Sequence, residues 1–167
     1  MATTATIRCI TSTSERQWAN RKVDAPGRKA NLALTEESFQ TIRGWGGCFN
    51  ELGALALEAL PKGRQKQVMK DLFHPQDRCR FSFCRLPIGA SDYGAEWYSL
   101  NENDGDFAMK KFSIARDKEI LIPYMKKAVQ FRRDLQLFAS PWSPPTWMKV
   151  PRACNYGTFI MEKEYLD

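Results

Sequence analysis

Short apolar segments alternate with segments of helical pattern along these 167 residues. The apolar segments are residues 44–49, a Gly-rich stretch that ends a strand and turns sharply, and residues 80–89 and 135–140, each of which is long enough for one strand. Because each is apolar on both faces, we predict strands buried between helices, which is typical of a parallel α/β fold. A barrel and a doubly wound sheet both have this order of elements. Residues 44–47 (GWGG) lack the third glycine of the dinucleotide-binding spacing, which favours the barrel.

Helix signals separate the predicted strands. Asn50 can cap a helix after the first strand, and Pro61 can begin a second helix. Pro123 can begin the helix that precedes the third strand. Residues 91–113 form a long polar connection, and connections of this length are more often functional than idle. The apolar positions that recur at helical spacing after Asn50 are Leu52, Leu55, Ala56 and Ala59.

Two further strand patterns precede this part of the chain. Residues 4–11 and 31–43 contain short alternating or β-branched runs. Residues 24–27 between them are typical of a turn. We therefore predict two N-terminal strands.

The composition excludes several classes of protein. With 43% hydrophobic and 26% charged residues, the chain is neither collagen-like nor wholly disordered. The net charge of +6 suggests a nucleic-acid binder, but the excess is spread over both ends without a basic run interleaved with aromatic residues. We interpret the charge as solvated surface and expect no nucleic-acid partner.

Signals for targeting and for metal binding are missing from the sequence. No run approaches the ~18 apolar residues of a membrane span, and no signal peptide is seen, so we expect a cytoplasmic chain without a span. The five cysteines are an odd number without a CxxC pair, which favours reduced thiols. His74 is the sole histidine, so we expect no zinc or iron site.

Polar and aromatic side chains follow each predicted strand, where parallel α/β folds place their sites. Arg85 requires a partner, because an unpaired buried charge is costly. Asp92 can form a structural ion pair with Arg85, or it can bind substrate hydroxyls while Arg85 orients a catalytic carboxylate. Trp142 offers a flat face and one N–H, which suits a sugar ring, although a tryptophan beside prolines is equally often core packing.

Glu51 and Asp92 are the carboxylates available for a glycosidase that uses two of them. Glu51 begins a predicted helix, however, where the helix dipole alone favours an acidic residue. The residues therefore indicate a carbohydrate-type pocket without an identified catalytic pair.

Three motifs resemble glycoside hydrolase family 30, the glucosylceramidase-like group that also holds β-1,6-glucanases. They are residues 44–49 (GWGGCF), 85–93 (RLPIGASDY) and 139–149 (ASPWSPPTWMK), and the last is highly specific. The resemblance covers about residue 31 to the C-terminus. It implies a (β/α)8 TIM barrel flanked by a small β-domain, and retaining hydrolysis of a β-glycoside without a cofactor.

The resemblance also divides the chain. Residues 1–40 correspond to strands of the accessory β-domain. Residues 41–167 correspond to the first part of the barrel, about three βα units that end after barrel strand 3.

Four residues correspond to family positions in the substrate site. Asp92 and Trp142 would contact the sugar in the −1 subsite, and Tyr93 would line the pocket. Arg85 would lie beside the nucleophile, and Trp147 would be a support.

The two catalytic glutamates of the family have no counterpart here. The acid/base belongs to an Asn-Glu-Pro motif after barrel strand 4 and the nucleophile follows strand 7, whereas Asn50 and Glu51 precede Leu52 after strand 1. We expect a fragment of a retaining β-glucosidase that is inactive and unstable or aggregating alone, because sheet edges and barrel-facing sides stay uncovered. A fragment of an endo-β-1,6-glucanase or galactanase, or a non-catalytic carbohydrate-binding fragment, are the alternatives. The oligomeric state is not predicted.

Overall fold

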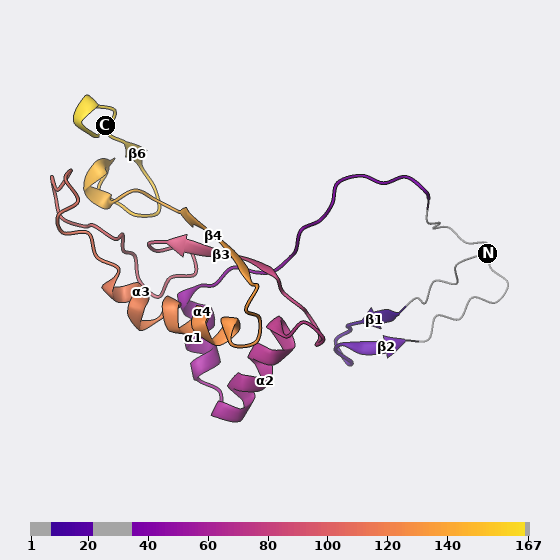
Figure 1. The fold of residues 1–167 in the computed structure, drawn as a ribbon. Coiled ribbons are helices and arrows are strands. Elements are labelled where there is room, and N and C mark those ends of the chain that lie inside the picture. The colour runs from indigo at the N-terminus through magenta and orange to yellow at the C-terminus, as the bar shows by residue number, and fades with distance from the viewer. Residues whose placement is uncertain (1–7, 22–34, 166–167) are drawn as a thin grey trace. The chain divides into compact units, whose positions relative to one another are not determined.

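The computed structural model describes residues 8–21 and 35–165, and the chain divides into two compact units, residues 1–40 and 41–167 (Figure 1). In the first unit, β1 (Cys9–Thr11) and β2 (Ala19–Arg21) form an antiparallel pair. The second unit contains the other elements. These are α1 (Glu51–Glu58), α2 (Lys62–Phe73), β3 (Phe83–Ile88), α3 (Ala115–Glu119), α4 (Leu121–Val129), β4 (Gln136–Pro141), β5 (Lys149–Val150), β6 (Thr158–Phe159), and the 3-10 turns Thr146–Met148 and Lys163–Tyr165.

The strand predicted over residues 31–43 is wrong for the part that the structure describes. Residues 35–43 contain no strand, and all of them are exposed. Phe39 is 84% exposed and Ile42 is 65% exposed, so their apolar side chains find no apolar surface among the described residues. Residues 31–34 lie outside the described residues, as do residues 4–7 of the other predicted strand, whose remainder contains β1.

Parallel pairing joins the three predicted apolar segments. β3 and β4 run parallel in continuous register and end together, with Ile88 opposite Pro141. On the other edge of β3, a parallel bridge joins Cys48 to Arg85, and backbone hydrogen bonds flank it. Residues 45–49 therefore run beside β3 as a bonded segment rather than as a full strand.

Gly46 allows this close approach. A Cβ atom at residue 46 would lie 2.2 Å from the Phe83 carbonyl oxygen and 2.6 Å from the Cys84 Sγ. Both distances are shorter than any van der Waals contact, so a side chain here would push the segment away from β3. This accounts for a glycine at the third position of GWGG.

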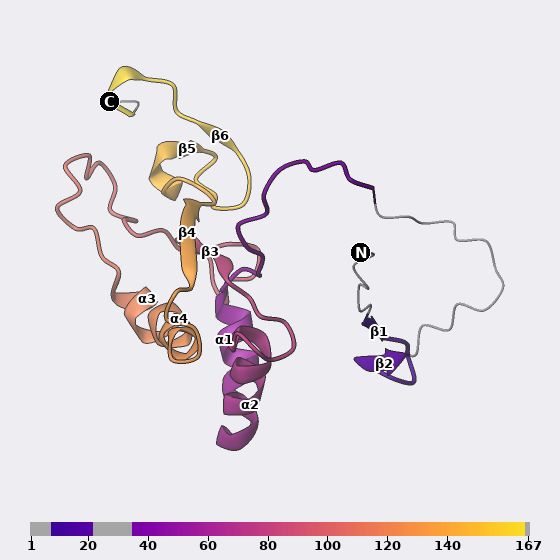
Figure 2. The same cartoon turned by 45° about the vertical axis from the view of Figure 1, so that its right-hand side comes forward.

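One face of the parallel segments packs on helices. Figures 1 and 2 show α1, α2 and α4 on the same side of β3 and β4. Phe49 stacks on Phe73 of α2 with 5.6 Å between ring centroids, and it meets Tyr124 of α4 edge-on at 5.0 Å. Full burial of a side chain of this size contributes roughly 1.5–3 kcal/mol. The buried residues of this core are Phe49, Leu57, Met69, Phe73, Cys84 and Ala128.

Helix α1 buries a different face from the one that its apolar residues predict. Asn50 caps the helix as predicted, because its side chain accepts a hydrogen bond from the Gly53 N–H at 2.7 Å. Leu52 and Leu55 are each 44% exposed, however. The cause is Glu51, whose carboxylate is held inside by the contacts described below. The buried positions of α1 are Glu51, Ala54 and Leu57.

The helix predicted from Pro123 begins earlier than expected. α3 precedes it, and α4 starts at Leu121, so Pro123 lies in the first turn of α4, where its missing N–H costs little. α2 begins directly after Pro61, as predicted, and buries Met69 and Phe73.

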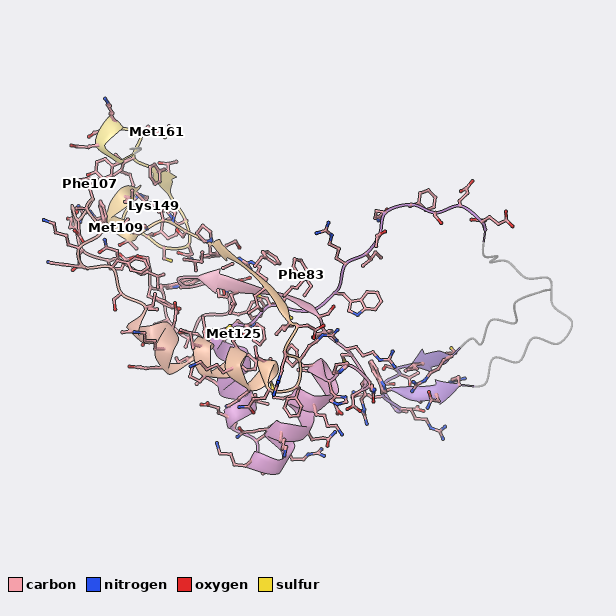
Figure 3. All side chains as sticks on the ribbon, viewed as in Figure 1. Phe83, Phe107, Met109, Met125, Lys149 and Met161 are labelled. Atoms are coloured by element: carbon pink, nitrogen blue, oxygen red, sulfur yellow. The ribbon has the colours of Figure 1, made fainter. Side chains whose placement is uncertain are left out.

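The opposite face of β3 and β4 is aromatic and exposed. Phe83 and Phe138 stack with 5.5 Å between ring centroids, yet they are 37% and 47% exposed. Figure 3 shows Phe83 on the side of the strands away from Met125 of α4. The prediction of a buried strand over residues 135–140 is therefore wrong in its burial, because helices cover only one face of β4 within the described chain.

Gly46→Ala and Gly63→Ala form a matched pair that tests the close approach. We expect Gly46→Ala to lower the free energy of unfolding by roughly 1–3 kcal/mol, because its Cβ meets backbone that cannot move freely. Gly63 lies in α2 with no atom within 4 Å of a built Cβ, so Gly63→Ala should raise stability by up to ~1 kcal/mol. Urea denaturation followed by circular dichroism measures both. Equal effects of the two substitutions would contradict this account of GWGG.

Candidate functional site

Two loops at the carboxyl ends of β3 and β4 carry most of the predicted site residues. Residues 89–114 follow β3 without a helix or strand, in agreement with the long connection predicted over residues 91–113. Residues 142–145 follow β4. Because Ile88 lies opposite Pro141, both loops leave the sheet at the same edge.

Arg85 lies inside β3 rather than at its end, and its side chain links the parallel segments. Its Nε donates a hydrogen bond to Ser140 Oγ at 2.8 Å, and its Nη1 lies 3.7 Å from Cys48 Sγ. Because side chains alternate along a strand, Arg85 shares with Phe83 the face opposite the core. Within the described chain, the ion pair with Asp92 that the sequence left open does not form.

Asp92 and Tyr93 present their side chains to solvent. Both are exposed, Tyr93 by 58%, and no hydrogen bond holds the Asp92 carboxylate within residues 8–21 and 35–165. The backbone here is fixed, however, because the Tyr93 carbonyl accepts a hydrogen bond from the Leu52 N–H at 3.1 Å. Ser91, which is buried, accepts a further bond from the Tyr93 N–H at 3.3 Å.

Trp142 stacks on a second indole that the sequence did not single out. The ring centroids of Trp97 and Trp142 are 5.4 Å apart and the planes are 10° from parallel. Trp142 is 38% exposed and Trp97 is 53% exposed, so neither ring is a core side chain. This contact joins the loop after β3 to the segment after β4.

Trp147 belongs to the interior of the same segment. It is 2% exposed, and its Nε1 donates to the Asn101 carbonyl at 2.9 Å. Its ring meets Phe107 edge-on at 5.1 Å. Figure 3 shows Phe107 near Lys149, whose buried Nζ donates to Ser143 Oγ at 3.0 Å. Trp147 therefore anchors the proline-rich segment, residues 141–147, in the protein interior, while Trp142 stays at the surface.

A buried ion pair connects three segments around the loop after β3. Glu51, at the start of α1, is 2% exposed. Arg116 of α3 donates to its two carboxylate oxygens at 2.7 and 3.1 Å, and the Ala95 N–H donates at 2.8 Å. Glu51 therefore positions the loop rather than offering a free carboxylate. Its neighbour Leu52 adds a link to the predicted site, because the Leu52 N–H donates to the Tyr93 carbonyl.

Opposing effects set the pKa of Glu51. Burial raises it, whereas the hydrogen bonds from Arg116 and Ala95 and the charge of Arg116 together outweigh burial, so the pKa lies below its usual value. The hydrogen bond to Glu51 also raises the pKa of Arg116. Glu51 is thus ionised over the whole physiological range.

Sequence reasoning missed Trp97 and Arg116. Trp97 lies in a polar loop, and Arg116 lies in α3, which the pattern from Pro123 onward did not include. The signal available for Trp97 was a large exposed aromatic residue four positions after Tyr93. No local signal pairs Arg116 with Glu51, because the two are 65 residues apart.

A mostly apolar cavity of about 320 Å³ lies elsewhere, between the strands and α4. Leu86 of β3, Ala139 of β4 and Met125 of α4 line it. It therefore lies on the helix side of the sheet rather than at the predicted site. Within the described residues, no group of three His, Cys, Asp or Glu side chains is placed to hold a metal ion.

Parallel segments packed on helices, with the candidate site at their carboxyl ends, are the arrangement found in parallel α/β folds, which include (β/α)8 barrels. Residues 42–164 match the Glycosyl hydrolase family 30 TIM-barrel domain, and the chain belongs to this family. The family predicted from the three motifs is confirmed.

Individual relatives agree with this assignment. Lysosomal acid glucosylceramidase of Mus musculus is 31% identical over 122 residues, which cover 72% of this chain and 24% of that protein. Endo-1,6-beta-D-glucanase of Neurospora crassa is 26% identical over 148 residues, which cover 84% of this chain and 30% of that protein. The crystal structure of SrfJ from Salmonella typhimurium superposes with a TM-score of 0.69 at 27% identity, over 87% of this chain and 34% of that one. The chain thus spans about a quarter to a third of the length of these proteins.

None of the helices in residues 8–21 and 35–165 combines the length and the apolar character needed to cross a bilayer.

The buried ion pair has a pH signature that Glu51→Gln tests. The pKa of Glu51 is lower in the folded chain than in the unfolded chain, so the ion pair stabilises fully above the unfolded-state pKa and is lost as the pH falls through the folded-state pKa. We expect Glu51→Gln to lower the free energy of unfolding by about 3 kcal/mol near neutral pH, and by less at an acidic pH below the unfolded-state pKa of Glu51. Urea denaturation at both pH values measures this difference.

Glu96→Gln is the control for that experiment. Glu96 also pairs with Arg116, at 2.7 Å, but its side chain is 73% exposed, so its loss should cost at most about 1 kcal/mol. A Glu51→Gln deficit that is the same at both pH values would contradict the ionic explanation.

Proposed function

We propose that this chain forms the sugar-binding part of the catalytic barrel of a retaining β-glycosidase that acts on β-glucosides. The observation that carries this proposal is the match of residues 42–164 to the family 30 barrel domain. Three features in the loops at one edge of β3 and β4 support it: the exposed Asp92 carboxylate, the Tyr93 ring and the stacked Trp142 indole. A carboxylate that accepts hydrogen bonds beside flat aromatic faces suits the hydroxyls and apolar face of a pyranose.

Each predicted site residue has a role in this proposal. Asp92 accepts hydrogen bonds from sugar hydroxyls, Trp142 stacks on the ring, and Tyr93 lines the pocket. Arg85 orients a catalytic carboxylate, because Ser140 and Cys48 occupy only two of the five N–H donors of its guanidinium. Arg85 is half-buried on the exposed face of β3, and these two contacts fix its guanidinium.

The chemistry itself requires groups beyond these. Retaining hydrolysis uses two carboxyl groups roughly 5–5.5 Å apart, one as nucleophile and one as acid and then base. Glu51 is unsuited to either role, since Arg116 and the Ala95 N–H occupy both of its oxygens. We propose that neither catalytic glutamate is among the residues of this chain. We also propose that residues 1–40 contribute strands to an accessory β-domain and that residues 41–167 begin a barrel.

A β-1,6-glucan is the second candidate substrate. The likeness to the Neurospora crassa endo-1,6-beta-D-glucanase extends over more of this chain than the likeness to the mouse glucosylceramidase, and this supports the alternative. An endo-acting site binds several sugars in a row, whereas a glucosylceramidase-like site binds one. Affinity for methyl β-D-glucoside compared with that for a β-1,6-linked glucose trisaccharide distinguishes the two substrates.

The purified 167-residue chain should not hydrolyse an aryl β-glucoside. The physical reason is that Asp92 alone cannot supply both the nucleophile and the acid/base. Release of the aryl alcohol, followed by absorbance, is the measurement. Turnover that is lost in Asp92→Asn would refute the proposal that the catalytic pair lies outside the chain.

Sugar binding by the same chain tests the site itself. Tryptophan fluorescence during titration with methyl β-D-glucoside should report binding, and Asp92→Asn or Trp142→Ala should weaken it about tenfold or more. The experiment is best done at low micromolar concentration, because the exposed Phe83 and Phe138 face favours self-association.

Two variants serve as controls for that titration. Asp134→Asn removes an exposed carboxylate that lies before β4, at the opposite end of the strand, and Trp45→Ala removes an exposed indole before β3. Both should bind as the unaltered chain does. Unchanged affinity in Asp92→Asn and Trp142→Ala would remove these residues from the proposed site.

A further inference from the structure

We propose that Arg116 and Trp97 are positioning residues for Trp142: Arg116 holds the loop on both sides of Trp97, and Trp97 holds the Trp142 indole by stacking. This inference rests on the proposed function of Trp142 as the face on which a sugar stacks. It assigns a role in substrate binding to two residues that need not contact the sugar themselves.

Arg116 contacts the residues that precede and follow Trp97. Its Nη1 lies 2.7 Å from a carboxylate oxygen of Glu96. Its guanidinium carbon lies over the ring of Tyr98, 4.4 Å from the centroid, in a cation–π contact. One planar group thus contacts both sequence neighbours of Trp97, and the backbone at residue 97 has little freedom to turn.

Arg116 is itself fixed by Glu51. The two hydrogen bonds between them, at 2.7 and 3.1 Å, form the paired geometry that a rigid guanidinium provides and that a lysine cannot reproduce. Glu51 also accepts the Ala95 N–H at 2.8 Å. Residues 95, 96 and 98 are therefore all tied to one buried ion pair, whereas Trp97 between Glu96 and Tyr98 has a different partner.

That partner is Trp142. The two indoles lie 5.4 Å apart and within 10° of parallel, and both are too exposed to be held by the core. Trp147, five residues further along, differs because a hydrogen bond to the Asn101 carbonyl and burial fix its ring. Within the described chain, no hydrogen bond holds the Trp142 indole, so its stacking on Trp97 is the contact that orients it.

The orientation of Trp142 affects affinity, because a sugar that binds to a mobile ring must restrict the motion of that ring, which costs conformational entropy. Stacking on Trp97 restricts the ring already in the folded chain, so this entropy is not lost again when the sugar binds. One face of Trp142 is used by Trp97, and its N–H remains available as a donor to a sugar hydroxyl. Loss of the stack should therefore weaken sugar binding by about threefold to tenfold, the range expected for one aromatic contact.

The test combines a spectroscopic signal with an affinity. Two stacked indoles couple excitonically in the far-ultraviolet circular dichroism spectrum without any ligand, and the size of the couplet depends on the in-plane twist between their transition dipoles. We expect the couplet to disappear in Trp97→Ala and to weaken clearly in Arg116→Lys, which keeps both tryptophans. Affinity for methyl β-D-glucoside should fall about threefold to tenfold in both variants, and Trp97→Phe should restore it, because phenylalanine can still stack.

A control and a milder variant keep the test decisive. Glu96→Gln removes a single exposed contact of Arg116 and should reduce the couplet even if Arg116→Lys fails to fold. Glu58→Gln removes an exposed ion pair with Lys127, 57% exposed on the Glu58 side, and should leave the couplet unchanged. A merely structural role of Arg116 would lower the unfolding free energy and leave the couplet of the folded chain intact.

The outcomes separate this inference from the function on which it rests. An unaltered couplet in Arg116→Lys and Glu96→Gln, or unaltered affinity in Trp97→Ala, would overturn the inference while sugar binding stands. A chain that binds no glucoside, but whose couplet responds to Arg116→Lys, would overturn the proposed function and support the link from Arg116 to Trp142. A couplet in the unaltered chain that persists in Trp97→Ala would overturn the stacked arrangement itself.

Discussion

The candidate site depends on the burial of one carboxylate. Glu51 is 2% exposed, and an ionised carboxylate removed from water without partners costs several kcal/mol. Arg116 and the Ala95 N–H compensate this cost, and they come from two segments that are distant in sequence. Folding must therefore bring α1, the loop after β3 and α3 together, because any one of them alone leaves a charge unpaired.

The same carboxylate decides which face of α1 is buried. With Glu51 inward, Leu52 and Leu55 turn outward and remain 44% exposed, although burial of leucine is ordinarily favourable. In exchange, the Leu52 N–H reaches the Tyr93 carbonyl at 3.1 Å and ties the first turn of α1 to the loop. In α1, therefore, two leucines remain partly exposed, and the first turn instead holds the loop that carries Asp92 and Trp97.

Local patterns in the sequence predict those features of this fold that depend on neighbouring residues. They fail where a residue's position depends on a partner that is distant in the sequence. The strands over residues 80–89 and 135–140 and the Asn50 cap depend on neighbouring residues, and they form where predicted. The buried face of α1 depends on a residue 65 positions away, so the apolar pattern misleads. Trp142 follows β4 directly, so position after a strand is enough to single it out, whereas Trp97 becomes notable only through its contact with Trp142. Arg85 lies inside β3, so the strand end predicted for it is wrong.

The two tryptophans of the proline-rich segment have different roles: Trp147 anchors the segment inside the protein, and Trp142 presents an indole to a ligand. Trp147 satisfies its N–H inside the protein, at 2.9 Å from the Asn101 carbonyl, and is then unavailable to a ligand. Within residues 8–21 and 35–165 the Trp142 N–H has no acceptor, so the ring needs another means of orientation, and a neighbouring indole supplies this without using the donor. A hydrogen bond would have fixed Trp142 as well, but it would have consumed the polar group that recognises a hydroxyl. Stacking is therefore the form of support that preserves a binding surface, and this is why the support for Trp142 is aromatic.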